Sequence, residues 1–118
     1  MDTEAQRRTE ALLDLLELRV PLAQALKELA TFGFAYDVDL CLIELRHVRG
    51  VVAAFVDGRL SADDCRDWAD ALEIREDVGF GEHGEELMKE FVFRVANPEI
   101  NGPFIAEEWS ARLAEFAR

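Results

Sequence analysis

The 118-residue sequence has few of the residues that form disulfide bonds or metal sites, since it contains only two cysteines and two histidines. Cys41 and Cys65 lack the paired Cys-x-x-Cys spacing of zinc sites, and both fall on apolar stripes of expected helices. We therefore expect two free, buried thiols and a reducing, cytoplasmic location. The opening "MDTEAQRRTE" has neither the basic flank nor the apolar centre of a secretory signal, which favours the same location.

Long apolar runs and basic side chains are also scarce. The longest apolar run, residues 51–56, is far below the roughly 18 residues that span a membrane. Only 13 Lys and Arg face 25 Asp and Glu, which gives a formal net charge of −12. That charge repels phosphates and anionic lipids, so we expect binding to neither nucleic acid nor membrane.

Half of the residues are hydrophobic, and their spacing is mainly helical. At this length the chain is expected to be one domain, residues 1–118, in an all-α fold: a compact bundle of about five to six helices. The expected helical segments are 3–18, 21–33, 38–56, 61–73, 85–96 and 103–116. Residues 48–56 and 91–95 are rich in β-branched and aromatic side chains, so a strand remains open at both places.

The best-defined helix start is at Ser61, because Ser61 and Asp64 have the spacing of a capping box. Asp37 is expected to be the N-cap of segment 38–56, and Pro103 is expected to be the first residue of the last helix. Within 61–73, Trp68 and Leu72 belong to the stripe that should face the core, and carboxylates fall on the opposite side.

Acidic residues concentrate in one part of the chain. Residues 57–90 hold 12 acidic and 4 basic side chains, a net −8 of the total −12. Such a cluster can be a solvated face that keeps an apolar protein soluble, or a docking surface for a basic protein. Phe80, between two glycines, is the aromatic residue expected to be exposed beside it. The candidate partner-binding residues are Asp63, Asp67, Asp70, Glu73, Glu76, Asp77, Phe80, Glu82 and Glu86.

No set of residues in the sequence has the pattern of an active site, so we expect no catalytic, cofactor or metal residues and no enzyme activity. Glu44 and His47 have the Glu-x-x-His spacing of di-iron helices, but His83 has no matching glutamate. We expect His47 to be structural. The glycines of "VGFGEHG" match no phosphate-binding loop. A metal-dependent enzyme using Glu44, His47, His83 and Glu86 remains an alternative.

Two stretches, "GRLSADDCRDWADALEIREDVGF" and "FRVANPEINGPF", carry a family resemblance. Together they resemble small acidic bacterial immunity-like proteins of polymorphic toxin and contact-dependent growth inhibition systems. The resemblance covers roughly residues 45–104 and departs from the shared pattern at Cys65 and Ile74. It implies a protein that neutralises a toxin domain in the cytoplasm of the producing cell.

The sequence therefore predicts a non-catalytic inhibitor that binds a basic effector, such as a toxin nuclease, through its acidic surface. Two alternatives share this absence of catalysis. One is a phage or plasmid counter-defence protein that mimics DNA, and the other is a small adaptor that binds through apolar surface. The oligomeric state is left open.

Overall fold

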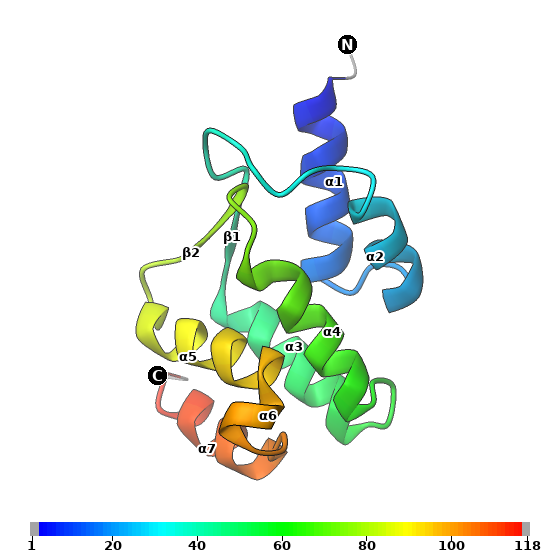
Figure 1. Cartoon of the computed structure of the whole chain (residues 1–118). Helices are drawn as coiled ribbons and strands as arrows, with labels where there is room; N and C mark the ends of the chain where they lie inside the picture. Colours follow the sequence, from blue (N-terminus) through cyan, green and yellow to red (C-terminus); the bar gives the residue numbers. More distant parts are fainter. Residues whose placement is uncertain (1–2, 117–118) are drawn as a thin grey trace.

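The computed structural model describes residues 3–116, which form seven helices and two short strands (Figure 1). The described part is elongated, with extents of 43 × 28 × 26 Å along its principal axes. The elements in chain order are α1 (Glu4–Leu16), α2 (Leu22–Leu29), β1 (Cys41–Ile43), α3 (Leu45–Val56), α4 (Ala62–Glu73), β2 (Val78–Phe80), α5 (Glu85–Ala96), α6 (Pro98–Asn101) and α7 (Ala106–Ala114).

The expectation of a mostly helical chain is confirmed. Residues 48–56 and 91–95, where a strand was possible, are helical and lie within α3 and α5. The expected count of five to six helices is too low, because residues 98–101 form a separate short helix with Pro98 in its first turn. The last helix begins at Ala106 rather than at Pro103.

The region before α3 differs most from expectation. Asp37 caps no helix: α3 begins only at Leu45, with extended Glu44 before it. Residues 41–43 form β1, which pairs in parallel with β2 in the register Cys41↔Val78 and Ile43↔Phe80. This two-stranded sheet ties the segment before α3 to the segment after α4, and it makes the purely all-α expectation wrong in this detail.

Trp68 and Phe91 occupy the centre of the core, and neither is measurably exposed. The Trp68 indole Nε1 donates a 2.9 Å hydrogen bond to the Leu15 carbonyl, which joins α4 to α1. Phe91 of α5 makes edge contacts with Trp68 and with Trp109 of α7, at ring-centroid distances of 6.3 and 5.0 Å. The expectation that Trp68 faces the core is confirmed, and Trp109 is buried with it.

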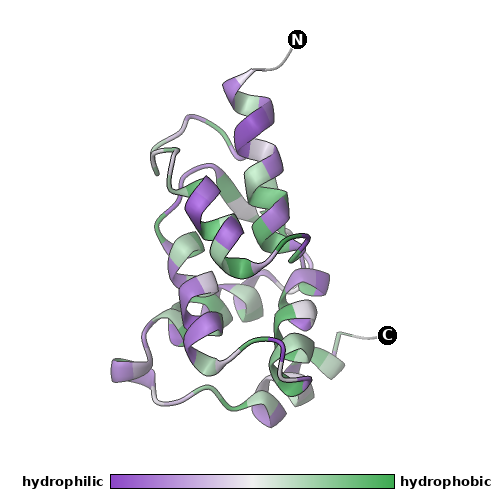
Figure 2. Cartoon of the chain, turned by 90° about the vertical axis from the view of Figure 1, so that its right-hand side faces the viewer, coloured by the Kyte–Doolittle hydropathy of each residue, from purple (hydrophilic) through white to green (hydrophobic). Residues whose placement is uncertain are grey.

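The helices pack in pairs around this core. α4 lies mainly against α5, α1 against α2, and α3 against α7. Figure 2 shows the helices with hydrophobic sides turned toward one another and hydrophilic sides turned outward. No helix among residues 3–116 is long and apolar enough to cross a membrane.

Candidate functional site

Helix α4 is positioned by its first turn and by its apolar stripe. The Ser61 hydroxyl accepts a hydrogen bond from the Asp64 backbone N–H at 3.0 Å, and the Asp64 carboxylate accepts one from the Ser61 N–H at 2.9 Å. This capping box satisfies two backbone donors, and it was predicted from the sequence. Cys65, Trp68 and Leu72 are buried, so the outer side of the helix is fixed toward solvent.

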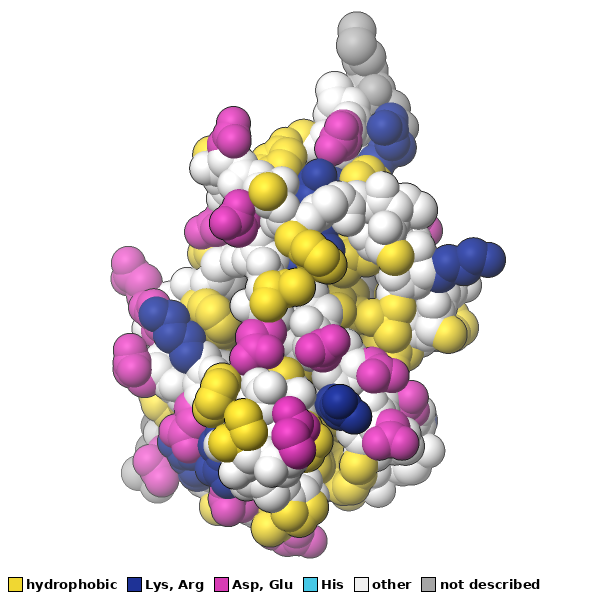
Figure 3. All heavy atoms as spheres, viewed as in Figure 1, with side chains coloured by type: hydrophobic (Ala, Val, Ile, Leu, Met, Phe, Trp, Pro, Cys, Tyr) yellow, Lys and Arg dark blue, Asp and Glu magenta, His cyan; other side chains and the backbone are white. Residues whose placement is uncertain are grey.

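The outer side of α4 carries a row of carboxylates, which we call the α4 acidic row. It consists of Asp63, Asp67, Asp70 and Glu73, all exposed. None of the four forms an ion pair with a residue in the described range 3–116. Glu73 accepts a 3.0 Å hydrogen bond from the Asn97 side chain. Figure 3 shows acidic side chains gathered over α4, with a basic side chain among them.

The expectation that Asp77 belongs to the exposed acidic surface is wrong, because its side chain has no solvent exposure. Arg8 Nη1 donates to Asp77 Oδ2 at 2.7 Å, and Arg75 Nε donates to Oδ1 at 2.8 Å. Burial opposes the charged carboxylate, but these guanidinium hydrogen bonds outweigh it and hold the pKa of Asp77 below its ordinary value. Asp77 is therefore a structural ion that joins α1 to the segment after α4.

The same two arginines hold the connector between α2 and β1. Both donate to the Gly33 carbonyl oxygen, Arg8 at 2.8 Å and Arg75 at 2.9 Å. The Arg8 guanidinium also lies 4.6 Å from the Tyr36 ring centroid, and that of Arg75 lies 5.6 Å from the ring of Phe34. The connector has no helix or strand of its own, and the buried cluster of Arg8, Arg75 and Asp77 holds its backbone through the Gly33 carbonyl.

Phe80 is only half-buried rather than exposed, because it packs against the core and lies 6.0 Å from the Lys89 ammonium group. Phe34, in the connector, and Phe93, on α5, are the more exposed aromatics, at 53% and 47%. Phe34 also follows a glycine, but only Phe80 has glycines on both sides, so the sequence favoured Phe80 as the exposed aromatic. The structure places Phe80 in β2 and leaves Phe34 in the connector.

The remaining predicted binding residues do not all join the α4 acidic row. Glu76 is exposed just beyond the end of α4, where its carboxylate accepts a 3.3 Å hydrogen bond from the Tyr36 N–H. Glu82 and Glu86 are also exposed, but they lie around the turn from β2 into α5. Figure 1 places that turn on the opposite side of the molecule from the start of α4. The predicted acidic surface is therefore two separate groups.

The histidines and cysteines do not form a reactive centre in the described chain. His47 is buried, its Nδ1 accepts a 2.9 Å hydrogen bond from the Glu44 N–H, and burial lowers its pKa. His83 is exposed and touches the Phe116 ring. Burial raises the pKa of Cys65 to about 12, which keeps this thiol protonated.

Residues 3–116 contain no group of three or more histidine, cysteine, aspartate or glutamate side chains placed to hold a metal ion. Glu44, His47, His83 and Glu86 are accordingly not brought together as the metal-enzyme alternative requires. Both cysteines are unpaired thiols, with Cys65 buried and Cys41 half-buried in β1 rather than on a helix.

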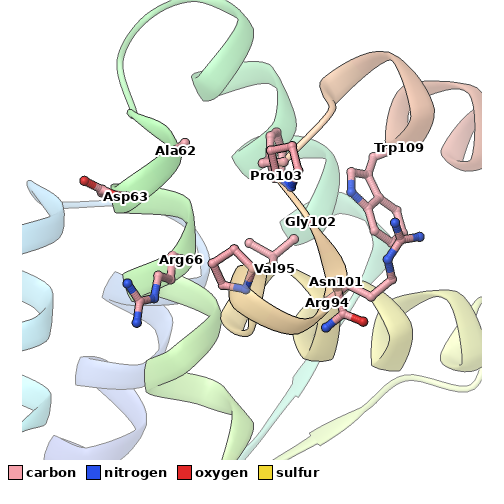
Figure 4. A pocket seen from close by; sticks show the side chains of 11 residues that line it. Ala62, Asp63, Arg66, Arg94, Val95, Asn101, Gly102, Pro103 and Trp109 are labelled. Carbon is pink, nitrogen blue, oxygen red and sulfur yellow. The ribbon is translucent and has the colours of Figure 1, made fainter.

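A hollow of 240 Å³ lies where the first turn of α4 meets the segment from α5 to α7. Figure 4 shows the Arg66 and Asp63 side chains pointing away from it, while the Arg94 side chain lies beside Trp109. Arg94 is already paired with Glu108 at 2.9 Å. The polar side chains that line the hollow therefore do not converge on a point inside it, and the hollow does not have the pattern of a catalytic site.

Comparison with known proteins adds no identification, since no protein-family model, curated protein or solved structure matches this chain.

Proposed function

We propose that this chain is a non-catalytic protein that binds a basic partner through the α4 acidic row. The observation that carries the proposal is the row of exposed carboxylates that form no ion pair within residues 3–116. Nine other carboxylates in that range are paired with arginine or lysine, and further exposed ones, such as Glu99 and Glu107, are unpaired. The row differs from these because four unpaired carboxylates lie together on the outer side of one helix. The paired cations are Arg8, Arg19, Arg46, Arg59, Arg75, Lys89, Arg94 and Arg112.

The physical argument is one of charge. Like charges three or four residues apart destabilise a helix by about 0.2–0.5 kcal/mol per pair, and the row contains three successive pairs of that spacing. The helix dipole favours Asp63 in the first turn, but it does not stabilise Asp67 or Asp70. A basic partner would remove this repulsion and would associate faster because of the complementary field.

The kind of partner follows from the family resemblance. A cytoplasmic inhibitor of immunity type binds a toxin domain of its own system, and a nuclease toxin has a cationic cleft for nucleic acid. Carboxylates seated in that cleft would exclude the substrate. The chain needs no catalytic group for this role.

The test is purification of the tagged chain from its source cells at low and high salt, with identification of the proteins that co-elute. We expect a basic protein at low salt that is lost at high salt, and whose activity falls when the purified chain is added. A DNA-binding defence protein as that partner would favour the DNA-mimic alternative. A partner retained at high salt would favour the apolar adaptor and contradict the proposal.

A further inference from the structure

An apolar hollow lies directly beside the α4 acidic row, between α2 and α4. It has a volume of 180 Å³. Its walls are almost wholly apolar: Leu26, Leu29, Phe32, Phe34 and Ala71. The one charged side chain at its edge, Arg75, has its guanidinium bound by Asp77 inside the protein. The hollow therefore offers an apolar surface with no free polar group to satisfy.

Phe34, which lines this hollow, and Ile74, the C-cap residue of α4, are large apolar side chains that remain exposed. Phe34 is 53% exposed and Ile74 is 58% exposed. Phe34 sits on the connector that Arg8 and Arg75 hold through the Gly33 carbonyl oxygen. These hydrogen bonds hold the backbone next to Phe34 in the free chain.

A carboxylate of the row stands next to the same hollow. Asp67 is one helical turn before Ala71 and lies on the same side of α4, whereas Asp70, the residue just before Ala71, is turned away by about 100°. Glu76 follows at the connector, where its backbone N–H donates a 2.9 Å hydrogen bond to the Phe34 carbonyl. An occupant must therefore be apolar at its tip and positively charged around it.

We propose that this hollow receives one large apolar side chain from a basic segment of the partner protein, with lysine or arginine beside it facing Asp67 and Glu76. The inference rests on the proposed function and adds the point of attachment. A cavity of about 150 Å³ accepts a benzene ring, so 180 Å³ accommodates a leucine side chain or an aromatic ring. Side chains of this kind, surrounded by complementary charge, carry most of the energy of protein interfaces.

The test uses three short synthetic peptides of the same length: a lysine-rich peptide with one central tryptophan, the same peptide with serine in place of tryptophan, and a glutamate-rich peptide with the tryptophan. Each is titrated into the isotope-labelled protein and followed by backbone amide chemical shifts. We expect the lysine–tryptophan peptide to shift the amides of Leu26, Phe34 and Ala71, and to bind about tenfold more tightly than the serine peptide.

Two variants locate the contact. Ala71→Gln extends a neutral side chain into the hollow, and Phe34→Ser removes part of its wall; each should weaken the lysine–tryptophan peptide to the level of the serine peptide. Phe93→Ser removes an equally exposed aromatic from α5 and should leave binding unchanged. The amide spectra of the free variants check that each is folded.

The outcomes separate the two proposals. Equal binding of the tryptophan and serine peptides overturns the hollow as an anchor while leaving charge-driven binding intact. Equal binding of the lysine and glutamate peptides contradicts the acidic row. An equal loss in Phe93→Ser, or no shift with any peptide, also overturns the inference.

Discussion

Asp77 is the residue whose role the structure changes most. Its carboxylate is buried between two arginines, and those arginines hold the carbonyl of Gly33 as well. Removing one partner of a buried ion cluster leaves an uncompensated charge, which costs far more than loss of an exposed ion pair. Asp77 therefore stabilises the fold, and it is not available to a partner.

We expect Asp77→Asn to lower the free energy of unfolding by about 3–5 kcal/mol, because both arginines remain charged and buried. Urea unfolding of the purified variant measures this loss. Asp70→Asn is the matched control: the same chemical change at an exposed site should alter stability by less than about 0.5 kcal/mol. Equal, small effects in the two variants would contradict the structural role of Asp77.

Glu90 makes the free energy of unfolding depend on pH. Its hydrogen bonds from Arg112 and then Arg94 lower its pKa from 4.5 to about 2. The folded chain thus releases this proton more readily than the unfolded chain, so the stabilisation is complete above pH 4.5 and is lost as the pH falls toward 2.

Replacing Glu90 by Gln should flatten the loss of stability across that window, while Glu107→Gln, an exposed carboxylate on α7, should leave it unchanged. The measurement is urea unfolding at a series of pH values. Part of the acid slope remains in Glu90→Gln, because the lowered pKa of Asp77 acts in the same direction. A slope unchanged by Glu90→Gln would contradict this assignment.

At the scale of elements, α4 joins a stabilising first turn to a repulsive outer face. Ser61→Ala removes the hydroxyl that accepts from the Asp64 N–H, and we expect a loss of about 1 kcal/mol in the free energy of unfolding. Ser110→Ala, at an exposed position within α7, is the control that keeps the same chemical change away from a helix cap. An equal effect at both serines would rule out the capping role.

The repulsion along α4 has the opposite sign. Asp67→Asn removes a charge that has like charges at Asp63 and Asp70, and we expect stability to rise by a few tenths of a kcal/mol. Thermal unfolding at low and moderate salt measures the effect, which should shrink as salt screens the charges. A loss of stability in this variant would show that Asp67 has a structural partner.

The elements also show what the sequence could and could not predict. α4 and α5 were predicted with nearly their observed bounds. In α4 the Ser61–Asp64 cap precedes an apolar period, and in α5 an apolar period ends just before Pro98. β1 and β2 were missed because a three-residue strand has too few positions for a period, and its partner is far along the chain. The same distance hides the burial of Asp77, which depends on Arg8 69 residues earlier.

At the scale of the whole molecule, the charge is unevenly compensated. Arginines are held by carboxylates around α1, α5 and α7, whereas the α4 acidic row has no such partner in the described range 3–116. The apolar hollow is lined in part by Ala71 of the same helix. This concentration of free charge beside apolar surface is the central claim of the proposed binding function.

The measurement that tests this claim most directly is a parallel purification of three tagged forms from lysate of the source cells, with quantitative mass spectrometry. The forms are the wild type, Asp63→Asn/Asp67→Asn/Asp70→Asn, and a control with Glu99→Gln/Glu107→Gln/Glu115→Gln. Each variant removes three negative charges from the formal −12, so both have the same net charge.

We predict that the wild type and the control recover the same basic protein at low salt, and that the α4 variant recovers about tenfold less of it, a difference of ~1.4 kcal/mol. Equal recovery by the α4 variant, or recovery of no basic protein by the wild type, would contradict the claim. The acidic row would then be a solvated face only.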